Sequence, residues 1–474
     1  MGLRTADEYR ASLRDGRTLW YRGKRVDDIL AEPDLRIAVD NAAVDFEMTH
    51  DDAHRELAVT TDPVTGAEYH ALYALPASPD DLVRRSRLIE IGSLLCGTIL
   101  SVKDVGSDAL LGLLSVLEGP GLERARAFYT RVAAEDLVLA VAQTDVKGDR
   151  AKAPHEQTDP DHYLRIVHET ADGIVVRGAK AHTTFGANCD EFIVLPTRAM
   201  KEDDAAWAVS FAVPANARGL SLYISSYSSG EHHPWDRPIS SRHKMLETLT
   251  VFDDVFIPWE RVFLAHDARL AGPLALAFVD FHRFTAVSYK LPLLDALVGA
   301  AGEIARMNGV MNAGHIREKL TQLVIYAETV RSLTESAARR GKVDARGICR
   351  PDSMTTNLAK YTFATGFHDA IRIVQECAGG LLVTGPGGDD WDAPEVRPVL
   401  EKYFKASAPA ADRLAMMNMI ADLTVGDFGG YQSVLAVHAE GSIEAEKMQI
   451  LREYDGARAT RRARWLARLD DHAE

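Results

Sequence analysis

The segment LRIVHETADGIVV, residues 164–176, decides the fold class of the middle of this chain. Apolar side chains alternate on both sides of Asp172-Gly173, and an Asp-Gly pair between two such segments is typical of a β-hairpin. Further short apolar segments follow at 191–196, 207–214, 220–224 and 250–258. Because no helical pattern of 10–15 residues separates them, the spacing favours an antiparallel sandwich or barrel over a doubly wound parallel sheet.

Helical patterns lie on both sides of this β segment. Ser78, Pro79 and two following aspartates form a helix start, since serine caps free amides, proline fits the first turn and acids suit the positive helix end. Between Ile316 and Val330, apolar residues recur at spacings of four and three, which predicts a bundle helix. We therefore expect an α+β protein with an N-terminal helical domain over 1–138, a central antiparallel β-domain over 139–270 and a C-terminal helical bundle over 271–474.

The composition is that of a folded enzyme from a reducing compartment. A net charge of -15 opposes binding to nucleic acid, although five arginines gather between residues 458 and 468, where we expect a solvated helix end. The four cysteines are scattered, which argues against a disulfide framework or a zinc site. The polar N-terminus and the lack of any run of about 18 apolar residues predict a cytoplasmic protein that neither is secreted nor crosses a membrane.

The densest group of polar side chains is QTDVKGDR, residues 143–150, where the helical part meets the β part. Gly148 permits close backbone approach, and the charged and hydroxyl side chains around it can hold the ring edge or the ribityl phosphate of a flavin. A polar surface turn is the alternative interpretation. A second polar segment, GAKAHTTFGAN at 178–188, contains Thr184, which can hydrogen-bond a flavin carbonyl or N5 or can belong to an ordinary inter-strand loop.

Together, QTDVKGDRAKAPHEQTDPDHYLRIV and DGIVVRGAKAHTT resemble the flavin-binding core of the 4-hydroxybutyryl-CoA dehydratases and, more loosely, of the 4-hydroxyphenylacetate 3-monooxygenases. The resemblance runs along nearly the whole chain, through RTADEYRASLRDGR at the start and AGGLLVTGP near residue 380. It implies an acyl-CoA dehydrogenase-like fold, bound FAD and a homotetramer. The FAD contacts that it implies are Gln143, Thr144, Asp145, Lys147, Gly148, Asp149, Arg150 and Thr184, then Gln375, Gly379 and Gly380 across a subunit interface, and finally His438, Gly441 and Ser442 in a segment that closes over the cofactor.

The departures from the dehydratase pattern concern its [4Fe–4S] cluster, which the resemblance places on three cysteines and one histidine. Near Cys96, the candidate cysteine positions hold Ile99, Leu100, Lys103 and Asp104, and Tyr289 stands where a further cysteine belongs. Because such clusters need thiolate ligands, we expect no Fe–S cluster and no other metal.

The family histidine that belongs with the cluster cysteines is kept as His282, and Glu247 matches an acidic residue of the family, which leaves these two as the one possible acid–base pair. A family tyrosine corresponds to Ala286 and a C-terminal family glutamate to Val434. The phenol hydroxylases differ in another way, since the Arg and Tyr of their G-R-x-P-D-Y motif correspond to Val105 and Ala109. We expect His282 and Glu247 to be the catalytic pair, with a satisfied helix histidine and a solvated strand-end acid as the alternatives.

No G-x-G-x-x-G fingerprint follows a strand, so a separate reductase would have to supply reduced flavin. We expect a two-component monooxygenase that uses FADH2 and O2 on a small molecule or an acyl thioester. The alternatives are a cluster-free acyl-CoA dehydratase or double-bond isomerase, and a flavin-binding protein without catalysis.

Overall fold

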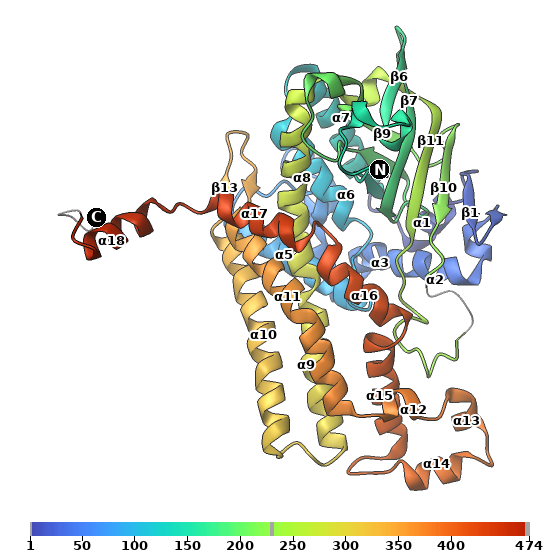
Figure 1. Cartoon of the computed structure of the whole chain (residues 1–474). Coiled ribbons are helices and arrows are strands. Elements are labelled where there is room, and N and C mark those ends of the chain that lie inside the picture. Colours follow the sequence, from blue (N-terminus) through green and yellow to red (C-terminus); the bar gives the residue numbers. More distant parts are fainter. Residues whose placement is uncertain (1, 228–231, 470–474) are drawn as a thin grey trace.

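The computed structural model describes residues 2–227 and 232–469 (Figure 1). Helices dominate both ends of the chain, and two β-sheets lie between them in sequence. The helices of the first part are α1 (Ala6–Ser12), α2 (Pro33–Ala42), α3 (Val44–His50), α4 (Arg55–Ala58), α5 (Pro79–Leu95), α6 (Asp104–Val116) and α7 (Gly119–Glu135). The predicted helix start is correct: α5 begins at Pro79, and the hydroxyl of Ser78 accepts a hydrogen bond from the Asp81 amide at 3.2 Å.

The larger sheet has six strands in the order β2-β1-β10-β11-β7-β6. Its strands are β1 (Leu19–Tyr21), β2 (Lys24–Val26), β6 (Arg165–Glu169), β7 (Gly173–Thr184), β10 (Leu220–Ile224) and β11 (Glu247–Pro258). Strands β6 and β7 pair antiparallel around Asp172-Gly173, so the hairpin that opened the sequence analysis is present. The largest part of this sheet is antiparallel, as expected.

A second sheet has four strands in the order β12-β9-β8-β5. Its strands are β5 (Leu139–Ala142), β8 (Glu191–Val194), β9 (Val209–Pro214) and β12 (Val262–Ala265). Phe211 of β9 meets Phe252 of β11 edge to face, with ring centroids 5.9 Å apart, so the two sheets share a core.

Two features of the sheets differ from the expectation. First, β5 pairs parallel with β8, and β1 pairs parallel with β10. Second, β1 and β2 come from the N-terminal region, which the sequence pattern predicted to be helical. They form a hairpin around Arg22 and Gly23, whose φ values of 50° and 77° fit a two-residue turn with both central residues left-handed. A strand of three residues is too short to show an alternation of apolar and polar side chains, so the sequence pattern did not predict β1 and β2.

The C-terminal part is a bundle of long helices (Figure 1). Its main members are α8 (Ala268–Tyr289), α9 (Leu291–Met307), α10 (Gly314–Arg339), α11 (Ser353–Ala378), α15 (Ala410–Thr424), α16 (Asp427–His438) and α17 (Ile443–Glu453). The predicted stripe lies on α10, where Ile316, Leu323 and Val330 are buried. Between α11 and α15 the chain forms the short helices α12 (Leu381–Thr384), α13 (Gly388–Asp392) and α14 (Arg397–Tyr403).

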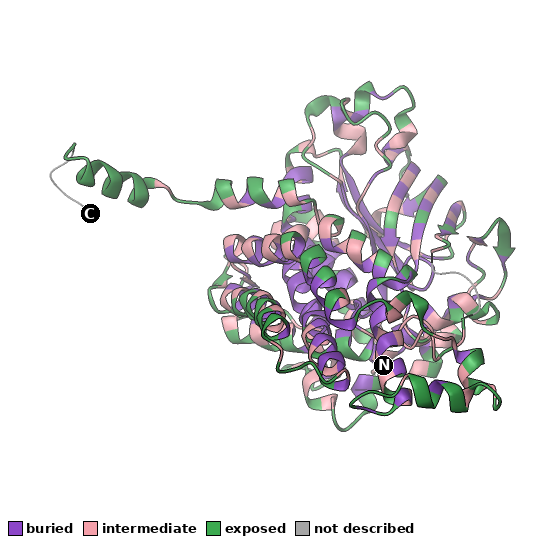
Figure 2. Cartoon of the chain, turned by 60° about the horizontal axis from the view of Figure 1, so that its bottom comes forward, coloured by how far each residue is buried: buried purple, intermediate pink, exposed green. Residues whose placement is uncertain are grey.

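The arginine-rich end of the chain forms α18 (Ala457–Leu466), which projects from the body and is exposed along its length (Figure 2). This agrees with the solvated helix end expected from its charges. Among the residues that the structure describes, no helix is both long and apolar enough to cross a membrane.

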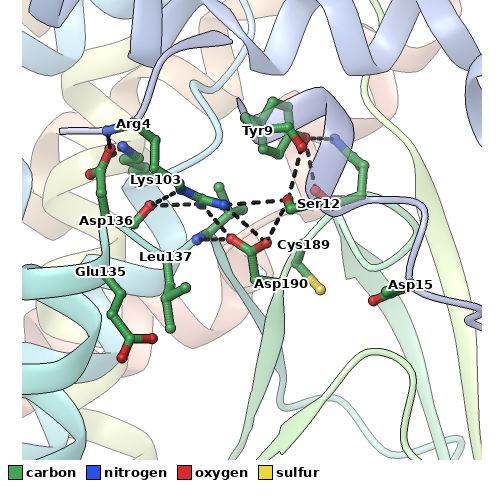
Figure 3. Close-up of polar contacts among 12 residues, drawn as sticks. Arg4, Tyr9, Ser12, Asp15, Lys103, Glu135, Asp136, Leu137, Cys189 and Asp190 are labelled. Atoms are coloured by element: carbon green, nitrogen blue, oxygen red, sulfur yellow. Dashed lines mark hydrogen bonds and ion pairs between the residues drawn. The ribbon is translucent and has the colours of Figure 1, made fainter. Parts of the chain in front are cut away.

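A buried polar network fixes the N-terminus against the central sheets (Figure 3). Arg4 forms an ion pair with Asp190 at 2.5 Å and donates to the carbonyl of Asp136 at 2.7 Å. The carboxylate of Asp136 in turn accepts from Lys103 at 2.6 Å, and both of these side chains are almost completely buried. Because Asp136 ends α7 and lies three residues before β5, this network holds the strand that leads into the 143–150 loop.

Candidate active site

Glu247 and Thr184 are paired in the register of β11 and β7, at the end of the larger sheet. The Thr184 hydroxyl donates to the Glu247 carboxylate at 3.0 Å, and the hydroxyl of Tyr431, from α16, donates to the same carboxylate at 2.7 Å. Burial raises the pKa of Glu247 to about 7, against the opposing effect of these two hydrogen bonds. The interpretation as a solvated strand-end acid is therefore wrong, because Tyr431 covers the carboxyl group.

Tyr431 is itself held in place by aromatic stacking. Its ring lies parallel to that of Tyr227, with centroids 4.3 Å apart, and the Tyr227 hydroxyl donates to the Met245 carbonyl at 2.6 Å. Neither tyrosine was singled out in the sequence, since Tyr431 lies 184 residues after Glu247 and Tyr227 lies 18 residues before Met245. The groups that donate to Glu247 are therefore two uncharged hydroxyls, and stacking fixes the position of the Tyr431 ring.

His282, on α8, has its Nδ1 atom 3.2 Å from a carboxylate oxygen of Asp108. Asp108 is fully buried on α6 and also accepts from Arg85 and Thr285, each at 2.8 Å. An ionised carboxylate only accepts hydrogen bonds, so Nδ1 carries the hydrogen and Nε2 keeps a free lone pair. A histidine in this arrangement is a proton acceptor whose charged form has a counterion. The signal for Asp108 in the sequence was a carboxylate in the middle of a largely apolar helix, which also carries Asp104 at its start.

A second glutamate, Glu440 between α16 and α17, has its side chain buried among positive charges near the end of α8. Glu440 accepts from the Tyr289 hydroxyl and from the Lys290 ammonium group, both at 2.9 Å, and Lys360 lies 3.7 Å away. Although burial acts in the opposite direction, the two lysines lower the pKa of Glu440 to about 2. Val434, which corresponds to the family glutamate in the sequence, is 61% exposed, so Glu440 supplies the buried carboxylate of this region.

The 143–150 loop is tied to the neighbouring strands. Asp145 is buried in an ion pair of 2.8 Å with Lys180, and its amide donates to the Thr197 hydroxyl at 2.9 Å. At Gly148, φ is +54° and a Cβ atom would lie 2.3 Å from Nδ1 of His162, so only glycine fits this turn. Asp145 therefore shapes the loop, in which Asp149 and Arg150 are exposed and Lys147 is half-buried.

The segment from His438 to Ser442 connects α16 to α17. Gly441 has φ of +115°, and a Cβ there would lie 2.4 Å from the guanidinium group of Arg283. The Arg283 side chain donates to the Glu440 carbonyl at 3.0 Å, and Ser442 caps α17. The closing segment, residues 438–442, is therefore anchored by Arg283 and by the charges around Glu440.

Gln375, Gly379 and Gly380 lie elsewhere in the chain. Asn357, near the start of α11, contacts Arg283 at 2.6 Å, whereas Gln375 lies roughly 27 Å further along the helix at a rise of about 1.5 Å per residue. Gln375 instead donates to the Thr424 carbonyl at 3.1 Å. A single chain does not bring these three residues to Glu247, and a contact across a subunit interface stays a prediction.

The side chains at the expected cluster positions do not fit an iron–sulfur cluster. Ile99 and Leu100 are buried apolar residues, the Tyr289 hydroxyl is bonded to Glu440, and the Cys96 thiol donates to the Asn41 carbonyl at 3.6 Å. Among the described residues, no group of three or more His, Cys, Asp or Glu could hold a metal ion.

Helices, two sheets and a helical bundle in this order define an acyl-CoA dehydrogenase-like fold. A solved glutaryl-CoA dehydrogenase superposes with a TM-score of 0.53 at 12% identity, over 94% of this chain and 93% of that one. The N-terminal profile of the 4-hydroxyphenylacetate 3-hydroxylase family matches residues 5–264, and its C-terminal profile matches residues 271–468. The chain belongs to this family.

Its relatives divide between two chemistries. It is 31% identical to a 4-hydroxybutyryl-CoA dehydratase/vinylacetyl-CoA-Δ-isomerase of Clostridium aminobutyricum, over 95% of this chain and 96% of that protein. It is 28% identical to the oxygenase component of a 4-hydroxyphenylacetate 3-monooxygenase of Thermus thermophilus, over 91% and 90% of the two chains. An archaeal 4-hydroxybutyryl-CoA dehydratase from N. maritimus superposes with a TM-score of 0.93 at 29% identity, covering 100% and 96%. The oxygenase component of a 4-hydroxyphenylacetate 3-monooxygenase in complex with FAD superposes with a TM-score of 0.91 at 26% identity, covering 98% of both.

Proposed function

We propose that this protein is an FAD-dependent enzyme that acts as the oxygenase component of a two-component monooxygenase. The observation that carries the proposal is the half-buried Glu247, whose pKa is raised to about 7 and which is hydrogen-bonded to Thr184, a residue that the family resemblance assigns to the flavin site. Bound FAD would supply electron transfer and oxygen chemistry. The residues of the chain bind the cofactor, exclude water and move protons.

The residues of the 143–150 loop fit a flavin. Gly148 allows close approach of the backbone, and Lys147 and Arg150 offer positive charge to phosphate. Thr184 donates to Glu247 and keeps lone pairs on its hydroxyl oxygen, so it can accept from a flavin N–H. We assign FAD contacts to Gln143, Thr144, Lys147, Gly148, Asp149, Arg150 and Thr184, and to His438, Gly441 and Ser442 of the closing segment.

Two groups in this site move protons. Glu247 is partly protonated near pH 7 and so can both donate and accept a proton at the working pH. His282 accepts a proton at Nε2 from a substrate hydroxyl or carbon, and Asp108 stabilises the resulting imidazolium. Tyr431 and Tyr227 cover Glu247 and keep water from it.

The substrate that suits this site is a small aromatic molecule or an acyl thioester. Val105 and Ala109, at the positions of the hydroxylase Arg and Tyr, are buried apolar residues that cannot hold a carboxylate. We further propose a separate flavin reductase as partner and a homotetramer in which Gln375, Gly379 and Gly380 reach the FAD of a neighbouring subunit.

A second candidate is a double-bond isomerase that acts on an acyl-CoA. The similarity to a dehydratase/isomerase over nearly the whole chain favours it, as do two acid–base groups that suffice to move a proton between carbons. Dehydration is less well supported because the residues at the cluster positions do not fit that cofactor.

One experiment separates these functions. Protein loaded with FAD and supplied with reduced flavin and labelled O2 is tested against a panel of phenols and phenolic thioesters, and product mass is recorded. In parallel, vinylacetyl-CoA is supplied without oxygen. Labelled oxygen in a product supports the monooxygenase, whereas anaerobic double-bond migration supports the isomerase. Bound FAD with neither reaction would contradict both and favour the non-catalytic alternative.

A further inference from the structure

Four buried charged side chains join the end of α8, helix α11 and the first turn of α17, and we call them the buried ion network. Glu440 lies 2.9 Å from Lys290 and 3.7 Å from Lys360, and Lys360 lies 2.8 Å from Glu446. Each of the four side chains is at most 3% exposed. Two cations and two anions therefore balance one another inside the protein, where a single unpaired charge would be strongly destabilising.

The backbone at Glu440 is held in a conformation that glutamate seldom adopts. Its φ is +56°, in the left-handed region that disfavours residues with a Cβ atom. Such a conformation persists only where the surrounding contacts impose it. Here the Glu440 carbonyl accepts from Arg283 at 3.0 Å, and its carboxylate accepts from the Tyr289 hydroxyl and the Lys290 ammonium group, each at 2.9 Å. Contacts to both its backbone and its side chain therefore fix the turn between α16 and α17.

Helix α16 connects this turn to Glu247. The helix ends at His438, two residues before Glu440, and Tyr431 lies about 10 Å further back along it at a rise of about 1.5 Å per residue. The Tyr431 hydroxyl donates to Glu247 at 2.7 Å. Because an O–H···O hydrogen bond of this length tolerates a displacement of only a few tenths of an ångström, a shift of the end of α16 would break it.

Four titratable groups interact electrostatically with Glu247, namely three tyrosines and one acid. The tyrosines are Tyr227, Tyr289 and Tyr431, and the charge of Glu247 raises the pKa of each of them. The acid is Glu440, whose charge raises the pKa of Glu247, although burial is the larger cause. Because Tyr431 covers the carboxyl group, the position of α16 decides how far Glu247 is shielded from water.

We propose that Glu440, Lys360 and Glu446 are positioning residues for Glu247. Through the turn at Glu440 they hold α16 so that the Tyr431 ring covers the Glu247 carboxyl group and the Tyr431 hydroxyl donates to it. The ion pair between Lys360 and Glu446 ties α17 to α11, and the contact of Lys360 with Glu440 ties the turn to the same helix. The inference rests on the proposed function only for the use that the reaction makes of the Glu247 proton, since the positioning concerns the protein alone.

The test removes one ion pair of the network without changing the net charge of the protein. The network variant combines Lys360→Met with Glu446→Gln. The control variant combines Lys447→Met with Glu444→Gln, which makes the same two changes in an exposed pair of α17 whose charged atoms lie 2.7 Å apart. Infrared spectroscopy follows the titration of the Glu247 carboxyl group in the full-length protein, and urea unfolding establishes that each variant is folded.

The titration midpoint of Glu247, which we expect near 7 in the wild type, should fall by about one pH unit or more in the network variant and stay unchanged in the control. Water then reaches the carboxyl group, and the loss of burial lowers the pKa more than the loss of the Tyr431 hydrogen bond raises it. In a Tyr431→Ala background the network variant should shift the midpoint by less than about 0.3 pH units, because both changes act through the same contact.

The inference is overturned by an unchanged midpoint in the folded network variant, by an equal shift in the control, or by a shift that adds in full to that of Tyr431→Ala. If the network variant does not fold, Glu446→Asp is compared with Glu444→Asp, because both substitutions keep the charge and shorten the side chain. A lower midpoint in Glu446→Asp alone is then expected, and equal midpoints would overturn the inference. Failure of the proposed function gives a different result, since a protein without turnover would still show the shift.

Discussion

Two glutamates in this molecule, the half-buried Glu247 and Glu440 with its buried side chain, each accept a hydrogen bond from a tyrosine, yet their pKa values move in opposite directions. Glu247 accepts from Tyr431 at 2.7 Å, and its pKa rises to about 7 because burial dominates. Glu440 accepts from Tyr289 at 2.9 Å, and its pKa falls to about 2 because Lys290 and Lys360 outweigh its burial. The charge of the neighbours, and not burial alone, decides which acid can exchange a proton at neutral pH.

The two acids also make opposite contributions to stability. The folded pKa of Glu440 lies below the usual 4.5, so its contribution is present above about pH 4.5 and is lost as pH falls towards 2. The folded pKa of Glu247 lies above 4.5, so its contribution is present below about pH 4.5 and is lost as pH rises through 7. We infer that Glu247 serves the reaction and Glu440 serves the architecture of the closing segment.

The largest effect is expected from Glu247→Gln, which removes the proton-exchanging group and keeps the shape. Turnover should fall by roughly 10²–10⁴-fold, the usual size of a general acid–base contribution, while FAD stays bound. Steady-state kinetics and the absorbance of bound flavin measure the two quantities. Glu260→Gln, on an exposed glutamate of the same β part, is the control and should leave turnover unchanged. Equal turnover in both variants would contradict the role of Glu247.

His282→Ala is expected to lower turnover by about 10²-fold with FAD retained. In a monooxygenase, oxygen consumption should continue and yield hydrogen peroxide in place of product, whereas an isomerase should lose its reaction outright. Oxygen uptake, peroxide and product are measured together, with the exposed His168→Ala as control. Unchanged turnover and unchanged coupling would show that the pair with Asp108 is only structural.

Lys290→Met tests the role of Glu440 in stability, because it removes one of the two lysines beside this buried carboxylate and leaves Lys360 as the remaining one. Breaking a buried ion pair in this way costs about 3–5 kcal/mol of unfolding free energy. The same substitution at Lys447, whose 2.7 Å pair with Glu444 is exposed, should cost less than about 1 kcal/mol. Urea unfolding measures both. Similar losses in the two variants would mean that Glu440 is not a buried anion, and Lys290→Met combined with Glu440→Gln should recover part of the loss.

A smaller effect is expected from Arg150→Ala, which removes a charge-assisted contact to FAD. The free energy of FAD binding should become less favourable by about 1.5–3 kcal/mol, and a titration followed by fluorescence quenching measures this change. FAD affinity equal to that of the wild type would remove Arg150 from the cofactor site.

Much of the fold was predictable because its signals are local. The Asp172-Gly173 hairpin, the Ser78 cap and the α10 stripe each depend on residues that are close in sequence. The β1–β2 hairpin was missed because three-residue strands carry no period, although Arg22-Gly23 between LWY and KRV was a turn signal.

The site was only partly predictable. The family resemblance identified Glu247 and His282 as candidates, and their spacing in the sequence gives no reason to expect that they lie in one site. The partners that set their chemistry are distant in the chain: Tyr431 lies 184 residues from Glu247, and Asp108 lies 174 residues from His282. Glu440 was missed for the same reason, since Tyr289 and Lys290 are about 150 residues away and only the folded chain brings them together.

The most direct test of the account is an infrared titration of the Glu247 carboxyl group in the full-length protein. The carbonyl stretch of a protonated, buried carboxylic acid should disappear with a midpoint near pH 7 and be absent from Glu247→Gln. In Tyr431→Phe the midpoint should move higher, because a hydrogen bond that stabilises the carboxylate is lost. A spectrum in which no carboxylic acid survives above pH 5, or in which Glu247→Gln keeps the same band, would contradict the claim that Glu247 exchanges a proton at neutral pH.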